Sequence, residues 1–271
     1  MKIARTCAAM AAGALALAGY AAGAGPSPGL DAGIGVKRPG GDVRFLALAA
    51  GRGTLVEKVR VHGGRVVRSR YLKGHFGVPL VTYGGDTGGL ARHAPRLVLA
   101  SGAGGQGTRF LVLDPRTLKV RQRITLHGAY AFDALSPDGS ILYLLQLRDL
   151  DNSVSYSVRA FDLDKQRFYR GAIVDRREPD EKMNGLPVTR VESGGGTWAY
   201  TLYSRTDKKP FVHALDTAHR RAVCIDLRSL PANVDWLWKV RMRMEAHRVV
   251  LVRGSKVLAR IDTKTFEVSP G

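Results

Sequence analysis

Apolar residues along the chain fall into short runs bounded by glycine, aspartate or proline, as expected of short β-strands joined by tight turns. One such unit, at residues 136–145, reads SPDGSILYLL, in which a polar turn leads into an apolar strand. A degenerate copy, SGGGTWAYTL, occupies residues 193–202 and begins 57 residues later. Strand repeats at a period of about 40 to 50 residues are typical of β-propellers, whose four-stranded blades bury their faces by stacking on one another. The pattern therefore predicts an all-β propeller fold.

A second landmark is the third strand of each predicted blade, which ends in an aspartate before a turn. These strands lie at 110–114, 158–162, 211–216 and 257–262, and their final aspartates are 48, 54 and 46 residues apart. Each carboxylate can brace its turn by accepting backbone amides two residues further on.

An earlier blade is predicted from the runs at 43–48, 55–61 and 65–72, with Gly63 and Gly64 in a hairpin turn. We therefore expect about five four-stranded blades, with six or seven as alternatives. These blades would form a single domain over residues 42–271, preceded by a flexible lead-in over 25–41 that is rich in glycine, proline and small residues.

The same residues also resemble a known repeat. The sequence LSPDGSILY at 135–143, followed by the strand at 158–162 and its turn, looks like the repeat of bacterial YVTN and TolB-like β-propellers. The stretch 174–227, which contains REPDEKM and WAYTLY, is similar to a group of exported bacterial propeller proteins. The resemblance implies a WD-repeat-like propeller and an extracytoplasmic location, and it implies no activity.

The first 24 residues have the pattern of a secretory signal peptide. Lys2 and Arg5 precede an uncharged apolar stretch over 8–18, and AGA at 22–24 offers a small-x-small cleavage site. The stretch is shorter than the roughly 20 strongly apolar residues that span a bilayer, although a retained anchor is the alternative. Tyr20 stands where a lipoprotein cleavage box carries its lipidated cysteine. We therefore expect a secreted protein that has no lipid anchor and, after cleavage, no transmembrane segment.

Charge is the strongest compositional bias, because 42 Lys and Arg against 23 Asp and Glu give a formal net charge of +19. Removing Lys2 and Arg5 with the signal leaves +17 on the mature chain. Such a field attracts polyanions, and outside the cytoplasm these are anionic cell-wall or surface polymers; the chain carries no specific motif for nucleic acid. A protein partner is the other expectation, and a generally cationic surface without a selected partner is the alternative to both. We expect a monomer.

Cleavage of the signal also removes Cys7 and leaves Cys224 as the one cysteine of the mature chain, so no intramolecular disulfide is expected.

The densest group of carboxylates lies on one predicted loop between blades, at Asp175, Glu178, Asp180 and Glu181. Carboxylate oxygens suit Ca²⁺, which takes about six to eight oxygen ligands. Three cations within the same loop compete for these carboxylates, and the spacing matches no calcium loop. A solvated mixed-charge loop, or ion pairs between blades, accounts for the cluster equally well. Ca²⁺ binding is kept as a hypothesis, and no other cofactor is expected.

Residues 239–245 alternate between charged and apolar side chains, which places Lys239, Arg241 and Arg243 on one face of a strand. As the innermost strand of a blade, this segment would line the central channel with positive charge and bind an anion there. As an outer strand it would be half solvated. The three cations are therefore a candidate anion-binding site.

Together these observations favour an exported, non-enzymatic propeller that acts as a binding or interaction module at the cell surface. One alternative is a metal-assisted hydrolase or lactonase at the propeller axis, which requires carboxylates and histidines from several blades to converge. Another is a wall-associated structural protein held by positive charge. No catalytic residue is assigned, because the seven histidines are scattered without metal-ligand spacing.

Overall fold

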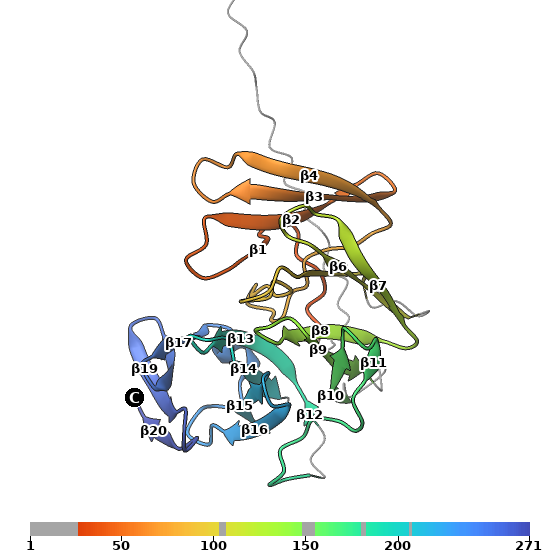
Figure 1. The fold of residues 1–271 in the computed structure, drawn as a ribbon. Coiled ribbons are helices and arrows are strands. Elements are labelled where there is room, and N and C mark those ends of the chain that lie inside the picture. The colour runs from red at the N-terminus through yellow and green to blue at the C-terminus, as the bar shows by residue number, and fades with distance from the viewer. Residues whose placement is uncertain (1–26, 103–106, 148–154, 180–182, 206–207) are drawn as a thin grey trace, which may run out of the picture.

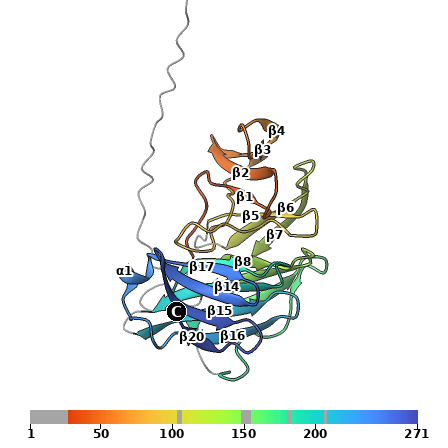
Figure 2. The ribbon, with the colours of Figure 1, turned by 90° about the vertical axis from the view of Figure 1, so that its left-hand side faces the viewer.

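The computed structural model describes residues 27–102, 107–147, 155–179, 183–205 and 208–271, so the predicted signal peptide lies outside the described residues. These residues form five antiparallel sheets whose strands follow chain order, and we number the sheets as blades 1 to 5 (Figures 1 and 2). The predicted β-propeller of about five blades is confirmed. No helix within the described ranges is long and apolar enough to cross a membrane.

Blade 1 contains β1 (Val36–Lys37), β2 (Val43–Ala50), β3 (Gly53–Arg60) and β4 (Val66–Lys73). Blade 2 contains three strands, β5 (Leu97–Ala100), β6 (Thr108–Leu113) and β7 (Val120–Leu126). Blade 3 contains β8 (Tyr130–Leu135), β9 (Ile141–Leu147), β10 (Ser155–Asp162) and β11 (Arg167–Phe168), with β12 (Met183–Asn184) also paired to β10. Blade 4 contains β13 (Leu186–Glu192), β14 (Trp198–Arg205), β15 (Lys208–Asp216) and β16 (Arg221–Asp226). The short helix α1 (Val234–Leu237) leads to blade 5, which contains β17 (Val240–Glu245), β18 (Arg248–Arg253), β19 (Lys256–Asp262) and β20 (Val268–Pro270).

The first blade begins inside the predicted lead-in. Val36 and Lys37 pair with β2, and the side chain of Val36 is buried between blades 1 and 2. The Asp31 carboxylate accepts the backbone amides of Gly33, Ile34 and Gly35, which fixes the turn ahead of β1. Residues 31–37 therefore belong to the ordered structure of blade 1.

An aspartate builds the same turn at the end of the second strand of blade 2 and of the third strand of blades 3, 4 and 5. Its carboxylate accepts the backbone N–H groups of the residues two and three positions on, at Asp114, Asp162, Asp216 and Asp262. The residue four positions on has a positive φ in every case, at Leu118, Gln166, Arg220 and Phe266. The prediction that these aspartates brace their turns is confirmed.

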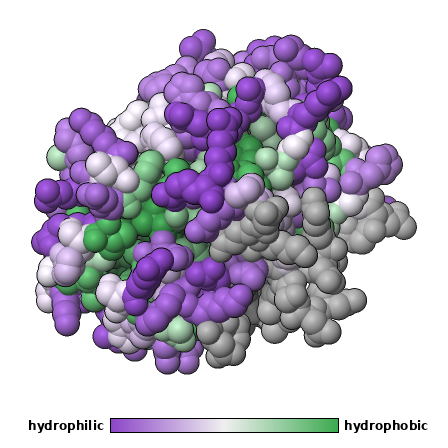
Figure 3. Space-filling view, turned by 90° about the horizontal axis from the view of Figure 1, so that it is seen from below, coloured by the Kyte–Doolittle hydropathy of each residue, from purple (hydrophilic) through white to green (hydrophobic). Residues whose placement is uncertain are grey.

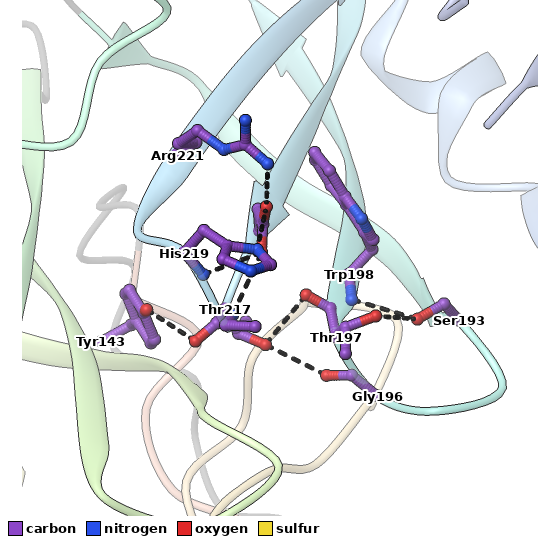
Figure 4. Close-up of polar contacts among 10 residues, drawn as sticks. Tyr143, Ser193, Gly196, Thr197, Trp198, Thr217, His219 and Arg221 are labelled. Carbon is purple, nitrogen blue, oxygen red and sulfur yellow. Dashed lines mark hydrogen bonds and ion pairs between the residues drawn. The ribbon is translucent and has the colours of Figure 1, made fainter. Parts of the chain in front are cut away.

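The two copies of the turn that reveal the repeat also share one geometry. The amide of Ile141 donates to Ser136 Oγ at 2.9 Å, and the amide of Trp198 donates to Ser193 Oγ at 3.0 Å (Figure 4). Gly139 and Gly196 occupy equivalent positions with φ of 71° and 72°, a conformation that glycine adopts without steric cost. The degenerate sequence SGGGTW therefore folds like SPDGSI because the serine and the last glycine are kept.

Each blade is held by apolar packing against the next. Four core clusters join blades 1 and 2, 2 and 3, 3 and 4, and 4 and 5. Tyr143 of blade 3 is fully buried against blade 4, and its hydroxyl donates to the Thr217 carbonyl at 2.7 Å (Figure 4). Tyr200 takes the matching place between blades 4 and 5. A blade of this size buries its faces only through such neighbours.

Blades 1 and 5 are joined differently. No core cluster within the described residues connects them, and both ribbon views place blade 1 at the top and blade 5 at the lower left (Figures 1 and 2). The connection between β4 and β5 instead runs to the other side of the ring. Its residues Tyr83 and Gly84 donate backbone N–H groups to the carbonyls of Pro187 and Val188 at 2.9 and 3.0 Å. The Tyr83 ring also meets Trp238, next to blade 5, edge-on at 5.7 Å.

Replacing Tyr143 or Tyr200 by alanine is expected to lower the free energy of unfolding by about 3 kcal/mol or more, because each ring is fully buried between blades. The control Tyr71→Ala, at a ring that is 55% exposed, should change it by less than about 0.5 kcal/mol. Urea midpoints measure all three variants. A loss below about 0.5 kcal/mol for both buried tyrosines would contradict this packing.

Candidate functional site

A buried ion pair lies at the centre of the propeller. Asp133 sits at a bulge in β8, and Arg190 comes from β13 of the next blade. The Arg190 guanidinium donates to both the carboxylate and the carbonyl of Asp133, while its Nε donates to Thr201 Oγ1 at 2.8 Å. Burial works against the charge of Arg190, but the Asp133 carboxylate outweighs it, so the pKa of Arg190 lies above its ordinary value.

The β4–β5 connection reaches the same pair through Asp86. The Asp86 carboxylate accepts the Thr82 hydroxyl at 2.7 Å and the backbone N–H of Arg190 at 2.8 Å. The connection, blade 3 and blade 4 are therefore bonded around one arginine. A buried charge of this kind is costly to leave unpaired, so each partner fixes the position of the others.

A cavity of about 380 Å³ opens beside this group. Three of its other charged lining side chains are also engaged: Arg92 lies 3.6 Å from Glu192, and Arg38 donates to the carbonyls of Ala91 and Ala94 at 2.9 and 2.7 Å. One carboxylate oxygen of the pair, Asp133 Oδ2, is buried and has no hydrogen-bond partner among the described residues. The axis is a site of internal ion pairing with room for a small polar molecule.

The sequence analysis did not single out Asp133, Arg190 or Asp86. The available signal was the run YAFDAL, in which one carboxylate interrupts an otherwise apolar innermost strand. A buried carboxylate requires a partner, but only the ring geometry identifies that partner as Arg190, 57 residues away.

The predicted metal-binding loop is described in part. Asp175 is buried, and its carboxylate accepts Arg177 Nη2 at 2.6 Å and the Cys224 backbone N–H at 2.8 Å. These bonds outweigh the effect of burial and hold the pKa of Asp175 below its ordinary value. Glu178 is exposed, whereas Asp180 and Glu181 lie outside the described residues. Within the described ranges no group of three potential metal ligands occurs, and Ca²⁺ binding stays a prediction.

The predicted anion-binding cations lie where the alternation places them. Lys239, Arg241 and Arg243 are exposed on and just before β17, the first strand of blade 5, which packs beside β13. Arg241 donates to the carbonyls of Trp238 and Val240 at 2.7 and 2.8 Å. Arg243 Nε donates to the neighbouring Glu245 at 2.6 Å. Anion binding by these three cations stays a prediction.

The distribution of charge is the most general feature of the surface. Six aspartates are buried within the described residues: Asp31, Asp114, Asp133, Asp162, Asp175 and Asp216. Arginines that pair with three of them are largely exposed, with Arg121, Arg177 and Arg221 at 61%, 59% and 55% of their side-chain surface. The negative ends of these ion pairs therefore point inward, and the positive ends face solvent.

Comparison with known proteins finds matches among solved structures only. No protein-family model and no curated protein matches the chain. Among solved structures, the chain is similar to the β-propeller domain of Cps50 (Swd1) from Myceliophteria thermophila, with 11% identity and a TM-score of 0.48, over 86% of this chain and 68% of that one. TolB from Acinetobacter baumannii gives 12% identity and a TM-score of 0.41, over 84% of this chain and 50% of that one.

A buried histidine lies next to the axial ion pair. His213 on β15 is the cross-strand neighbour of Thr201, which receives the Arg190 Nε–H. Burial lowers the pKa of His213 to about 4, and nearby Asp133 only partly opposes this shift. His213 is therefore neutral in the folded protein at neutral pH.

The lowered pKa of His213 predicts a loss of stability in mild acid. His213 takes up a proton near pH 6.5 in the unfolded chain and only near pH 4 in the folded chain. Its contribution to the free energy of unfolding is therefore complete above pH 6.5 and is lost as the pH falls toward 4. The loss should be on the order of 3 kcal/mol.

Urea midpoints at pH 7 and pH 5 test this expectation, with His213→Gln as the variant and exposed His62→Gln as the control. The urea midpoint of the His213 variant should change much less between pH 7 and pH 5 than that of the control. Equal pH dependence in both variants would contradict the assignment.

Proposed function

We propose that the protein is an exported, non-enzymatic propeller that binds anionic polymers at the cell surface. The observation that carries this proposal is the inward placement of aspartates and the outward placement of the arginines that pair with them. Most lysines and arginines of the described residues are exposed, so the excess positive charge of this part of the chain is in contact with solvent. Such a field draws polyanions to the surface and increases the rate of encounter.

The location follows from the N-terminal pattern of charges and small residues described above. Export would place the protein among cell-wall and surface polymers, and Tyr20 in place of a lipidated cysteine favours a freely diffusing form. Mutual repulsion between strongly cationic copies favours a monomer.

Lys239, Arg241 and Arg243 are our candidates for direct contact with the polymer. All three are exposed on one strand face, opposite the buried side chains of Val240 and Met242. Arg243 shares its charge with Glu245, so we expect Lys239 and Arg241 to contribute more. Each cation that meets an anionic group releases a counterion, which makes binding dependent on salt.

Titration of the mature chain with polyphosphate at increasing salt tests the proposal. Affinity should fall linearly on a log–log plot, and the variant with Lys239→Gln, Arg241→Gln and Arg243→Gln should reduce the slope by about two to three. A control that neutralises three exposed cations of blade 1, with Arg65→Gln, Arg68→Gln and Lys73→Gln, should change the slope less.

Two results would reject this proposal. Absence of binding to polyphosphate, or binding that salt does not weaken, would exclude an electrostatic surface module. A thermal shift that requires a divalent metal and is reversed by EDTA would instead support the metal-assisted hydrolase at the axis.

A further inference from the structure

A groove lies at the outer rim between blades 4 and 5, away from the axis. Its volume is about 490 Å³, which is within the range of about 300 to 1,000 Å³ found for ligand sites. We call it the rim groove and define it by Arg176, Arg177, Trp198, Arg221, Val223, Lys264 and Phe266. The segment after β11, strands β14 and β16, and the β19–β20 turn each contribute to it.

The floor of the rim groove is apolar and only partly covered. Trp198 stacks on Tyr200 with ring centroids 6.1 Å apart and meets Phe266 at 5.4 Å. Trp198, Phe266 and Val223 are half-buried, packed against the core on one side and open to the groove on the other. Seen from below, the molecule shows a strip of apolar surface between hydrophilic margins (Figure 3).

Phe266 adopts a backbone conformation that its residue type disfavours. Its φ is 61°, in the left-handed region where glycine and asparagine are common and aromatic residues are not. The same turn position in blades 2, 3 and 4 carries Leu118, Gln166 and Arg220, also with positive φ, so this conformation belongs to the aspartate turn itself. Phe266 provides an aromatic wall to the groove at the expense of local backbone strain.

The margins of the groove are cationic and preorganised. Arg177 is held by Asp175 through two hydrogen bonds from Nε, at 3.0 and 3.1 Å, and one from Nη2 at 2.6 Å. Arg221 Nη2 donates to Asp216 Oδ2 at 2.9 Å (Figure 4). Both carboxylates are buried, with 4% and 1% of their side chains exposed, while both guanidinium groups reach solvent. Arg176 and Lys264 add two exposed cations.

We propose that the rim groove binds an acidic peptide segment of a partner protein, with one aromatic or large aliphatic side chain on the Trp198–Phe266 floor and carboxylates on the surrounding cations. The complementarity has two parts. The guanidinium groups of Arg177 and Arg221 are fixed by their internal bonds and reach solvent, so they lose little side-chain freedom when they meet a carboxylate. The open aromatic floor matches a buried anchor residue, the kind that contributes most to the affinity of an interface.

The apolar floor is the reason for choosing a peptide over a uniformly charged polymer. A polymer of repeating anionic groups satisfies the cations but leaves Trp198, Phe266 and Val223 uncovered. Burial of apolar area contributes roughly 25 cal/mol per Å², and a peptide side chain adds this contribution to the charge pairing. The site is separate from the polyanion binding proposed above, since it adds a contact that salt does not screen.

The experiment measures binding of a short fluorescent peptide that has a central tryptophan flanked by glutamates. Its comparison peptide has serine in place of the tryptophan and the same charge. Phe266→Asn removes the aromatic wall and places a residue tolerant of positive φ in the turn. The variant should bind the tryptophan peptide at least about tenfold more weakly and the serine peptide with unchanged affinity.

Gln166→Asn, the same turn position in blade 3, is the matched control and should bind both peptides as the natural chain does. A second pair of variants addresses charge. The tryptophan peptide should bind several-fold more weakly to the variant with Arg176→Gln and Lys264→Gln. The control with Lys165→Gln and Arg170→Gln, at the rim of blade 3, should bind it with unchanged affinity.

Equal affinity of the natural chain for the two peptides would overturn the proposal, since the floor would then contribute nothing. The proposal would also be overturned if Phe266→Asn and Gln166→Asn lost the same affinity for the tryptophan peptide. Polyphosphate binding measured on the same variants separates this outcome from the surface proposal, because Phe266→Asn leaves the charge of the chain unchanged.

Discussion

The structure depends on aspartates at the ends of strands, three of the four buried, that are bonded within the protein. In blades 2 to 5 the carboxylate that closes the strand before the last accepts two backbone amides, and it thereby sets the turn from which the outermost strand returns. These bonds hold the pKa values of Asp114, Asp162, Asp216 and Asp262 below their ordinary values, and a side chain on the following segment adds to the effect at each. The carboxylates stay ionised where burial alone would disfavour charge. The same hydrogen bonds therefore set both the geometry of the turns and the lowered pKa values.

The same arrangement governs what the protein offers to partners. A carboxylate that is buried in a turn fixes the position of its arginine, while the guanidinium group still reaches solvent. Arg177 and Arg221 are therefore both fixed and available, which distinguishes them from exposed lysines that lose side-chain entropy on binding. Where two such arginines flank a partly open aromatic pair, as at Trp198 and Phe266, charge and apolar surface occur in one place.

Sequence predicted the parts of this structure that are local. The blade strands, the aspartate turns and the serine–glycine turn at Ser136 and Ser193 all arise from interactions over fewer than six residues, which sequence spacing records. The axial ion pair and the rim groove could not be predicted in this way. Asp133 meets Arg190, and Trp198 meets Phe266, only because separate blades stack in one ring. The contact between Asp175 and the Cys224 backbone N–H likewise joins residues that are far apart in the sequence, so spacing does not record it.

The β4–β5 connection explains how the arc of blades is held together although no core cluster within the described residues joins its two ends. It bonds to β13 through backbone groups at Tyr83 and Gly84 and brings Asp86 to Arg190. Those bonds are directional, so they restrain the connection against blade 4 in a way that apolar contact alone would not. The charged groups at the axis are mutually bonded for this structural purpose. The rim arginines are ion-paired too, but their guanidinium groups reach solvent, and the rim is therefore the part of the propeller best suited to recognition.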